Sequence, residues 1–446
     1  MYFPSRSCVL QGDCLNESAI LKDKGGLMKP ELLMPAGSLE KLKYAYNYGA
    51  DAVYVGVPLF SLRARENEMT YDDLAEGIRF ARENGKQIYV TANIFARNLK
   101  LKSFRENFKK WVELKPDAFI MSDPGLMMIA KEVDPDVNIH LSVQSNCMNW
   151  QSVKFWQQQG ATRIILSREL RLEEIKEIHE RVPDIELEAF VHGSICIAYS
   201  GRCLLSHYMS YRDANQGVCD NSCRYGYNVF KAQGEKDEEF YLEDLRNKGE
   251  FYQIDEDEHG TYIMNAKDLC VIEHLKELRE AGICSFKVEG RTKSVYYAAM
   301  VSRIYRQAID DMMAGKEFDK NLLLELNKVA NRGYHKGFVV GNVSHESQEY
   351  RHSTSRNFSQ KFAGVVLGEG AMPGYVKVEA RHRLRPGDEV EVISPTGIQK
   401  SVIGQILNEK KEQVPQAGGG GLIFDVEMSA QPHPQALVSL LEKGGF

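Results

Sequence analysis

The 446-residue sequence has no uninterrupted apolar stretch of the roughly 18 residues that a membrane-spanning helix needs. Residues 1–28 also lack the continuous apolar segment of a signal peptide. Positive charge is not in excess, because 56 Lys and Arg stand against 62 Asp and Glu, for a net charge of −6. This balance excludes a global attraction to nucleic acid or to an anionic membrane, so any RNA contact must use a local patch. We expect a cytoplasmic protein without membrane association.

Familiar hydrolase motifs are missing as well. There is no Gly-x-Ser-x-Gly nucleophile elbow, and neither His179-Glu180 nor His345-Glu346 has the second His of the His-Glu-x-x-His zinc motif. The sequence therefore contains no local motif that indicates a protease. What is present is an ordinary folded composition, 43% hydrophobic and 26% charged, which excludes a disordered, collagen-like or coiled-coil chain.

Short apolar segments alternate with helix-length amphipathic segments from Glu31 onward. Because the apolar segments are nearly continuous, the alternation is typical of βα units in a parallel sheet. Eight such units predict a closed (β/α)₈ barrel of the TIM type. The alternative is an open doubly wound sheet, whose dinucleotide-binding form is disfavoured because no Gly-x-Gly-x-x-Gly follows the first strand. The predicted strands are Glu31–Ala36, Ala52–Gly56, Gln87–Asn93, Ala118–Asp123, Asn138–Gln144, Arg163–Ser167, Glu186–His192 and Ser285–Glu289.

The pattern divides the chain into three parts. Residues 1–28 carry neither strand nor helix periodicity, so we expect a disordered extension and a true start at Met28. Residues 29–340 form the predicted barrel, interrupted by a long excursion over residues 193–260. From Gln360 the pattern changes to short alternating strands with turns such as Pro386-Gly387-Asp388, which predicts a small antiparallel β-barrel domain within residues 341–446.

Four of the nine cysteines crowd into the excursion with the spacing C-x6-C-x15-C-x3-C, at Cys196, Cys203, Cys219 and Cys223. In a reducing compartment such crowding indicates metal ligands or redox groups rather than disulfides. Zinc sites usually show pairs of cysteines two to four residues apart, whereas uneven spacing suits a cuboidal iron–sulfur cluster. An iron–sulfur cluster, a zinc site and unliganded buried thiols remain open on spacing alone.

The excursion leaves the carboxyl end of the seventh strand, and active sites of (β/α)₈ barrels form at that end of the strands. Polar residues accumulate there, although the interior of a barrel prefers aliphatic side chains. The alternative for each of them is a salt bridge or a helix cap. The segment Glu289–Ser294 offers cations before a helix and predicts an anion site, the alternative being an ordinary helix start capped by Thr292 or Ser294. The candidate catalytic residues are Gln144, Glu188, His192 and Glu289, and the candidate substrate-binding residues at the strand ends are Arg63, Arg65, Arg168, Arg291 and Lys293.

The stretch Glu188–Ser206 resembles the collagenase-like peptidase family thirty-two. The family signature, Glu-x-Phe-x-x-Gly-(Ser/Ala)-aliphatic-Cys-x4-Gly-x-Cys-x-aliphatic-Ser, is matched at every specified position. Within the family the sequence is most similar to the prephenate-dependent tRNA uridine hydroxylases, with supporting stretches at Ser122–Leu126, His140–Gln144 and Lys287–Ser294. The similarity covers Lys29 to about Phe338 and continues more weakly into the C-terminal domain, whereas residues 1–28 have no counterpart.

The resemblance implies a 4Fe-4S cluster on Cys196, Cys203, Cys219 and Cys223. It further implies a tRNA-modifying enzyme that hydroxylates C5 of the wobble uridine to 5-hydroxyuridine, with prephenate as co-substrate. Two other functions stay open: a metal-assisted, collagenase-like peptidase, and a non-enzymatic iron–sulfur accessory protein that scaffolds a partner.

Prephenate carries two carboxylates, which guanidinium groups bind in a bidentate manner. Arg168 and Arg291 are therefore the first candidates for its binding, followed by Arg63 and Arg65. Residues 351–385 hold seven Lys and Arg against two Glu. We expect this stretch, through Arg381, Arg383 and Arg385, to contact the tRNA backbone near the anticodon while the barrel takes up the flipped-out uridine. The alternative is a solvated charged surface.

Overall fold

The computed structural model describes residues 29–62, 69–196, 198–203, 205–224, 227–231, 240–244, 248, 251–254, 256–257, 260–261, 267–341, 360–431 and 433–441. The expected N-terminal extension and the candidates Arg63 and Arg65 lie outside these residues. No helix in the described part of the chain is both long enough and apolar enough to span a bilayer.

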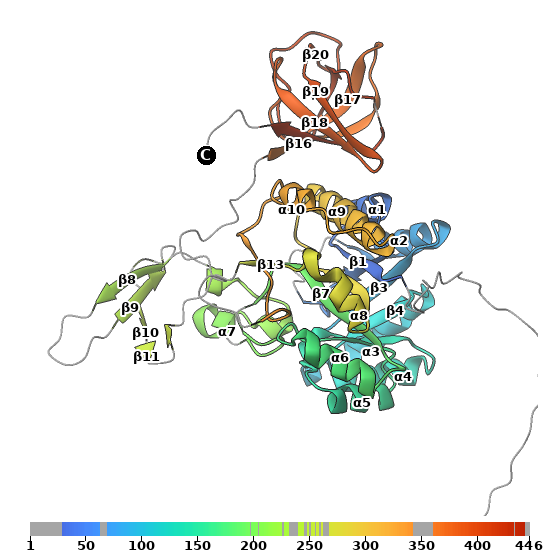
Figure 1. Cartoon of the computed structure of the whole chain (residues 1–446), viewed down its shortest axis with the longest axis vertical. Coiled ribbons are helices and arrows are strands. Elements are labelled where there is room, and N and C mark those ends of the chain that lie inside the picture. The colour runs from blue at the N-terminus through green and yellow to red at the C-terminus, as the bar shows by residue number, and fades with distance from the viewer. Residues whose placement is uncertain are drawn as a thin grey trace, which may run out of the picture.

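Eight parallel strands form a closed barrel at the centre of the molecule (Figure 1). β14 pairs in parallel with both β7 and β1, which closes the sheet. The predicted (β/α)₈ barrel is thereby confirmed, and the open doubly wound alternative is wrong. The strands are β1 (Glu31–Ala36), β2 (Ala52–Gly56), β3 (Gln87–Ala92), β4 (Ala118–Met121), β5 (Ile139–Leu141), β6 (Arg163–Ile165), β7 (Glu186–Gly193) and β14 (Ile283–Val288).

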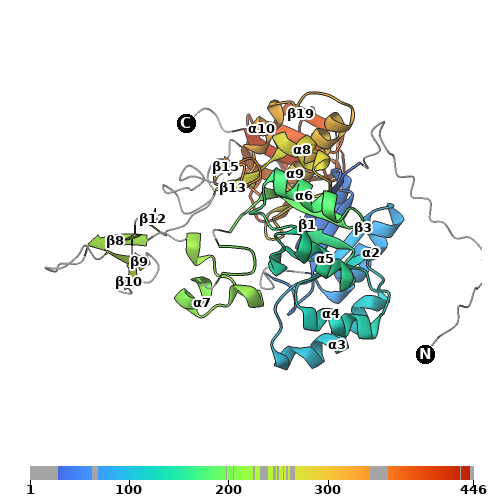
Figure 2. The ribbon, with the colours of Figure 1, turned by 60° about the horizontal axis from the view of Figure 1, so that its bottom comes forward.

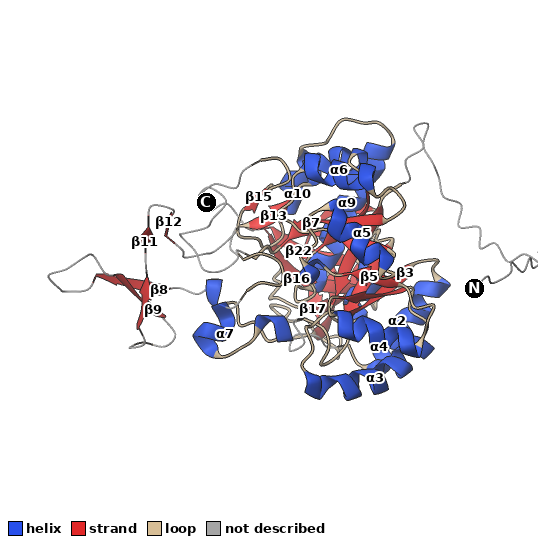
Figure 3. Cartoon of the chain, turned by 90° about the horizontal axis from the view of Figure 1, so that it is seen from below, coloured by secondary structure: helices blue, strands red, loops and turns tan. Residues whose placement is uncertain are grey.

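Helices cover the outside of the barrel (Figure 3). Side chains that accept a hydrogen bond from the first turn fix several helix starts, namely Ser38, Thr70, Asp123, Asn149 and Ser294. The helices are α1 (Leu39–Asn47), α2 (Tyr71–Glu83), α3 (Asn98–Glu113), α4 (Pro124–Val133), α5 (Trp150–Gln158), α6 (Leu172–Arg181), α8 (Leu275–Glu280), α9 (Val295–Met313) and α10 (Asn321–Leu326).

The excursion between β7 and β14 lies to one side of the barrel (Figure 2). It contains α7 (Leu205–Ser210), an antiparallel sheet of β8 (Tyr227–Lys231), β9 (Phe240–Asp244) and β10 (Phe251–Ile254), and the short pair β11 (Glu256–Asp257) and β12 (Gly260–Thr261). It ends at β13 (Asp268–Cys270), which runs antiparallel to the end of β7 and pairs on its other side with β15 (Tyr334–His335).

Seven antiparallel strands form the C-terminal domain in the order β19-β18-β22-β16-β17-β21-β20. The predicted antiparallel β domain is thereby confirmed. Its interior is a separate apolar cluster that includes Val366, Val378 and Val438. The strands are β16 (Gln360–Glu369), β17 (Tyr375–Ala380), β18 (Glu389–Ser394), β19 (Gly397–Val402), β20 (Ile406–Leu407), β21 (Leu422–Glu427) and β22 (Leu437–Leu441).

The C-terminal domain packs against the barrel flank formed by α1, α9 and α10 (Figure 1). The Tyr48 hydroxyl donates to the Ile393 carbonyl at 2.8 Å, and the Tyr296 ring stacks on Phe362 at 5.5 Å. Lys328 adds a 2.9 Å ion pair to Glu391. Apolar stacking and buried polar contacts together fix the position of the domain on the barrel.

Candidate functional site

A pocket of about 300 Å³ lies at the carboxyl ends of the barrel strands. Strand residues such as Tyr54, Thr91 and Ile120 line its floor, and the excursion supplies a wall. A second hollow of about 640 Å³ lies on the C-terminal domain, but its described lining contains no cysteine, histidine or arginine. The barrel pocket is therefore the better candidate for chemistry, in agreement with the usual location of active sites in this fold.

Two glycines of the signature allow the excursion to fold back over the pocket. Gly193 has φ of 103°, and a Cβ there would collide with the Glu289 carbonyl. Gly201 has φ of 72°, and a Cβ there would collide with the Gln144 carbonyl. Only glycine combines a positive φ with the absence of a Cβ atom. The two glycines therefore determine how closely the cysteine-bearing segment approaches the barrel.

All four predicted cysteines line the pocket as free thiols. Cys196 and Cys219 are exposed, whereas Cys203 and Cys223 are half-buried. Burial raises the pKa of Cys203, and the nearby Cys196 and Cys219 raise it further. As the described side chains stand, no three from Cys, His, Asp and Glu are close enough to hold one metal ion. Four thiols from one segment around one pocket nevertheless fit, as a donor set, a group ligated by four cysteines.

Arg168 and Arg291 both line this pocket, together with Gln144 and Glu289. Arg168 donates from Nη1 to the Ser194 carbonyl at 3.0 Å, and its guanidinium lies 5.0 Å from the Phe190 ring centre. Arg291 is buried and donates to the Leu62 carbonyl, which holds it across the top of the barrel. Two guanidinium groups and two polar strand-end side chains thus meet in one cavity.

Lys287 is a third cation of the pocket and is not among the predicted site residues. It is 3% exposed, and its Nζ lies 2.6 Å from Glu188 Oε1 and 4.5 Å from the Tyr54 ring centre. Burial lowers the pKa of Lys287, while the Glu188 carboxylate opposes that shift. The pair places a charge-compensated ammonium group at the pocket wall.

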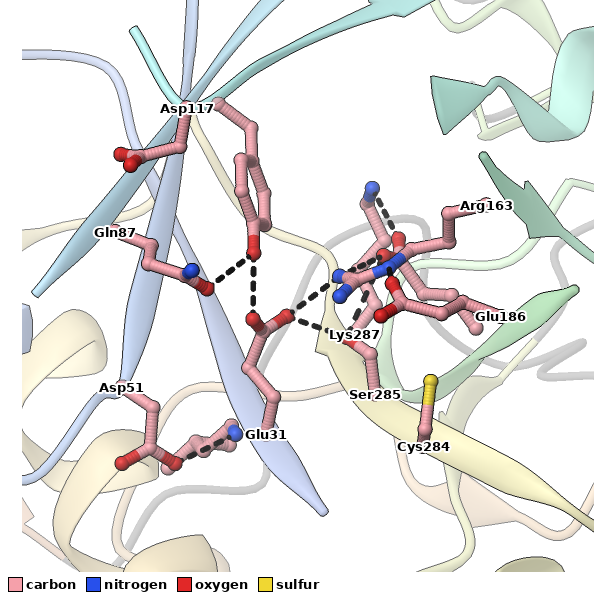
Figure 4. A network of polar contacts seen from close by, with 12 residues as sticks. Glu31, Asp51, Gln87, Asp117, Arg163, Glu186, Cys284, Ser285 and Lys287 are labelled. Carbon is pink, nitrogen blue, oxygen red and sulfur yellow. Dashed lines mark hydrogen bonds and ion pairs between the residues drawn. The ribbon is translucent and has the colours of Figure 1, made fainter. Parts of the chain in front are cut away.

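A network of ion pairs around the buried Arg163 continues below Lys287 toward the amino ends of the strands (Figure 4). Arg163 Nη1 lies 2.8 Å from Glu31 and 3.2 Å from Glu188, and its Nε lies 2.7 Å from Glu186. Burial disfavours the charge of Arg163, but Glu31, Tyr89 and Glu188 raise its pKa well above the usual range. The three carboxylates compensate the two buried cations, which is the condition for such a network to be tolerated in a core.

His192, Glu188 and Lys293 are predicted site residues that the structure places outside the pocket lining. His192 is buried against Tyr305, whose hydroxyl lies 3.3 Å from Nδ1, and burial lowers its pKa to about 4. Lys293 lies over the Tyr297 ring, and the Ser294 side chain accepts from the Tyr297 N–H. The capped helix start therefore forms, and of the two cations in this segment only Arg291 is in the pocket lining.

A β-bulge explains the position of His192. Phe190 pairs with Lys287 and His192 pairs with the next residue, Val288, so Val191 is an extra residue in β7. A one-residue shift reverses the side that later side chains face. Glu188 and Phe190, which precede the bulge, face Lys287 inside the barrel. His192 follows the bulge and therefore faces the other side, toward Tyr305 of α9.

The basic edge of the C-terminal domain is exposed at Arg381, Arg383 and Arg385. Arg381 is shared between Glu40 at 3.4 Å and Glu379 at 3.1 Å. Glu40 is in the first turn of α1, directly after the carboxyl end of β1, so this edge lies toward the same end of the barrel as the pocket. Arg351 and Arg356, which contribute to the charge count of this stretch, lie outside the described residues.

Comparison with known proteins identifies the family. Residues 37–349 match the model described as "Peptidase family U32", and residues 359–438 match "Peptidase family U32 C-terminal domain". The chain belongs to peptidase family U32. The resemblance expected from Glu188–Ser206 is thereby confirmed, and the cysteine-lined pocket is the candidate site of a U32 protein.

Relatives of this chain include proteins named for tRNA hydroxylation and a protein named a collagenase. "tRNA hydroxylation protein P" of Escherichia coli K12 is 46% identical over 421 residues, which are 89% of this chain and 93% of the relative. "tRNA hydroxylation protein P1" of Bacillus subtilis is 39% identical over 370 residues, 82% of this chain and 84% of the relative. "Collagenase" of Porphyromonas gingivalis is 30% identical over 383 residues, 82% of this chain and 87% of the relative.

Proposed function

We propose that this protein is a cytoplasmic tRNA hydroxylase that converts the wobble uridine to 5-hydroxyuridine, using prephenate as co-substrate and a 4Fe-4S cluster on Cys196, Cys203, Cys219 and Cys223. The observation that carries the proposal is the single pocket lined by all four cysteines and by Arg168, Arg291 and Lys287. The relatives of higher identity, which are named for tRNA hydroxylation, give it further support.

The four cysteines are the proposed ligands of the cluster. When bound, an iron–sulfur cluster supplies redox capacity, with a potential set by hydrogen bonds and solvent exposure. The Asn221 N–H already donates to Cys219 Sγ at 3.4 Å, which is the kind of hydrogen bond that tunes such a sulfur.

The cations of the pocket are the proposed binding groups for the two carboxylates of prephenate. Arg168 and Arg291 offer forked donors, and Lys287 offers a point charge deeper in the barrel. Ile120, Ile165 and Phe190 provide an apolar surface on which a six-membered ring can pack. Charge and apolar surface thus occur together in the combination that this co-substrate requires.

Gln144 and Glu289 are the proposed partners of the uracil edge, because both are polar and both line the pocket. A base must leave its stack before a protein can react with its ring, and the pocket is the cavity that receives it in this proposal. His192 and Glu188 lie outside the pocket lining, so we assign them positioning roles. His192 supports the end of β7, and Glu188 holds Lys287 in place.

The peptidase alternative has weaker support in the site. Nucleophilic proteolysis requires a base beside the nucleophile. The described lining of the pocket includes Ser142, Ser194 and Ser200 but no histidine. One relative is nevertheless named a collagenase, so gelatin hydrolysis belongs in the test.

The decisive experiment is nucleoside mass spectrometry of tRNA from a strain that lacks this gene. We expect 5-hydroxyuridine and its derivatives to disappear, and to return with the wild-type gene but not with Cys203→Ser. Unchanged 5-hydroxyuridine in the deletion strain, or gelatin hydrolysis by the purified holoprotein, would overturn the proposed function. Reappearance of the nucleoside with a Cys203→Ser/Cys219→Ser variant would instead contradict the role of the cluster.

A further inference from the structure

Two tyrosines of the excursion are unusually exposed. Among the Phe, Tyr and Trp side chains that the structure describes, four are more than 40% exposed: Tyr71 at 43%, Phe155 at 52%, Tyr199 at 54% and Tyr211 at 89%. Two of the four lie in the excursion among the cysteines. Tyr199 lines the pocket itself, and Tyr211 directly precedes Arg212, which also lines it. One large ring thus contacts solvent in the pocket lining, and the other contacts solvent next to a lining residue.

Tyr211 is also held in a strained backbone conformation. Its φ is 56°, in the left-handed region that bulky residues seldom adopt. The Tyr211 N–H donates to the His207 carbonyl at 2.9 Å as α7 ends, and the Arg212 N–H donates to the Ser206 carbonyl at 3.3 Å. The turn thus places the ring outside and returns the chain to the pocket at Arg212. Non-glycine residues in such conformations cluster at ligand-binding sites, where the strain has a use.

Positive charge is in excess in the segment that carries the two rings and in the segment that contacts it. Residues 95–102 and 198–220 contain Arg97, Lys100, Lys102, Arg202 and Arg212 against Asp213 and Asp220, a local charge of 5 − 2 = +3 in a chain of −6. The two segments are in contact, because the Phe95 N–H donates to the Asn215 carbonyl at 3.4 Å and Arg97 lies 3.6 Å from Asp213. Arg202 is exposed, and the Arg97 side chain is 73% exposed. The cations are therefore accessible to a polyanion.

We propose that this rim, defined as Arg97, Tyr199, Arg202, Tyr211 and Arg212, binds the single-stranded RNA on either side of the base that enters the pocket. Tyr199 and Tyr211 stack on the neighbouring bases, and the three arginines contact backbone phosphates. Exposed aromatic rings interleaved with cations are the combination by which proteins hold single-stranded nucleic acid, because every base has a stacking face and every linkage has a charge.

This inference rests on the proposed function and extends it, since it assigns the excursion an RNA-binding role besides that of carrying the cysteines. The choice of RNA over an acidic peptide follows from the rings: a peptide would satisfy the arginines but would give two solvent-exposed tyrosines no planar partner. Tyr199 and Arg212 of the rim line the pocket, which suits a partner that passes over the pocket while one unit of it enters, as a flipped-out nucleotide does.

The test uses the holoprotein and a fluorescently labelled anticodon stem-loop RNA, with affinity measured by anisotropy at several salt concentrations. Tyr199→Ala and Tyr211→Ala are each expected to weaken binding by roughly 5- to 150-fold, the range of one lost stacking contact. Tyr→Phe at either position should retain wild-type affinity, because stacking needs the ring and not the hydroxyl. Phe155→Ala on α5 is the matched control, because its ring is about as exposed as that of Tyr199 and its loss should have no effect.

The two kinds of contact predict different salt dependence. Tyrosine variants should shift log K without changing its slope against log salt, whereas Arg202→Gln and Arg212→Gln should each flatten the slope by roughly one unit or slightly less. Tyr211→Gly distinguishes the effect of backbone strain from the effect of the ring. The melting temperature should rise, because glycine adopts the left-handed conformation without strain, whereas the affinity for RNA should fall, because the ring is gone.

Two results would overturn the inference. One is wild-type RNA affinity in the Tyr199→Ala/Tyr211→Ala double variant, and the other is displacement of the RNA by polyglutamate with equal loss of polyglutamate binding in that variant. If the wild-type holoprotein itself does not bind the stem-loop, the proposed tRNA function fails and not merely the assignment of the rim.

Discussion

Lys287 Nζ and Glu188 Oε1 lie 2.6 Å apart inside the barrel, with both side chains almost fully removed from solvent. A buried ion pair of this kind is costly to break, because the remaining partner loses charge compensation in surroundings that solvate it poorly. The pair connects the candidate pocket to the ionic network of the barrel interior, since Glu188 also contacts Arg163. Stability and ligand binding therefore depend on the same two residues.

Removing one member of this pair should destabilise the protein more than removing both. We expect Lys287→Met to lower the free energy of unfolding by about 3 kcal/mol, and Lys287→Met/Glu188→Gln to recover part of that loss. Urea unfolding of the single and double variants measures the coupling. Equal stability of the single variant and the wild type would show that the pair contributes nothing to the fold.

Cluster ligation predicts the metal content of the protein. After anaerobic purification we expect about four irons and four sulfides per chain, as one cubane requires, and loss of the brown colour when any one of Cys196, Cys203, Cys219 or Cys223 becomes Ser. Cys270→Ser is the matched control, because Cys270 is buried beside Tyr305 and away from the pocket. Stoichiometric zinc with no iron would contradict the cluster.

Arg168 and Arg291 should determine the affinity for prephenate. Losing one charge-assisted pair costs about 1.5 to 3 kcal/mol, or roughly 10- to 150-fold in the dissociation constant of either Ala variant. Arg168→Lys should recover only part of the affinity, because an ammonium group cannot form the forked contact. Calorimetric titration with prephenate measures these constants, and Arg105→Ala on the outer surface of α3 serves as control. Undiminished affinity in both Ala variants would place the carboxylate site elsewhere.

The buried His192 should make stability depend on pH. Its pKa is lowered to about 4 in the folded protein, against an ordinary value near 6.5, so between these values the unfolded chain binds a proton that the folded chain does not. Stability from this group is complete above about pH 6.5 and falls by about 1.4 kcal/mol per pH unit as the pH decreases toward 4. Urea unfolding of wild type and His192→Gln between pH 4 and 8 isolates the effect, since His140 is common to both. A parallel pH dependence in the two proteins would refute it.

The basic edge of the C-terminal domain should contribute unequally to tRNA binding. The Arg381 guanidinium is already ion-paired with Glu40 and Glu379, whereas no ion pair joins the guanidinium groups of Arg383 and Arg385 to a carboxylate among the described residues. Arg383→Gln/Arg385→Gln should flatten the salt dependence of full-length tRNA binding by roughly two units, and Arg381→Gln by less than one. Prephenate affinity and iron content should not change. Identical slopes for all variants would mean that this edge is only a solvated surface.

The barrel could be predicted because its strands are buried on both faces and read as apolar runs, as Ala52–Gly56 does. β13 and β15 could not, because three and two residues are too short to show a period. The expectation of an aliphatic interior also gives no reason to place Arg163 inside the barrel, where its carboxylate partner Glu31 comes from a strand 132 residues earlier in the sequence.

The candidate site was predictable to the extent that position along a strand determines position in a barrel. Gln144, Arg168, Glu289 and Arg291 lie at the ends of predicted strands or directly after them, and all four line one pocket. The same reasoning places His192 there, but strict alternation ends at the bulge of Val191, which depends on pairing with β14 and leaves no mark in the local sequence. Tyr199 and Tyr211 carry no periodic signal either, and their exposure follows only from the folded excursion.

The docking of the C-terminal domain bears on cooperativity. Val365, Ile393 and Leu437 belong to the same apolar cluster as the barrel residues Leu32 and Ile304, so the hydrophobic core extends from one domain into the other. Separating the domains would expose that shared surface to water, at a free-energy penalty proportional to its area. The barrel and the β domain are thus coupled thermodynamically, and a calorimetric scan of the intact chain should show them melting in a single transition.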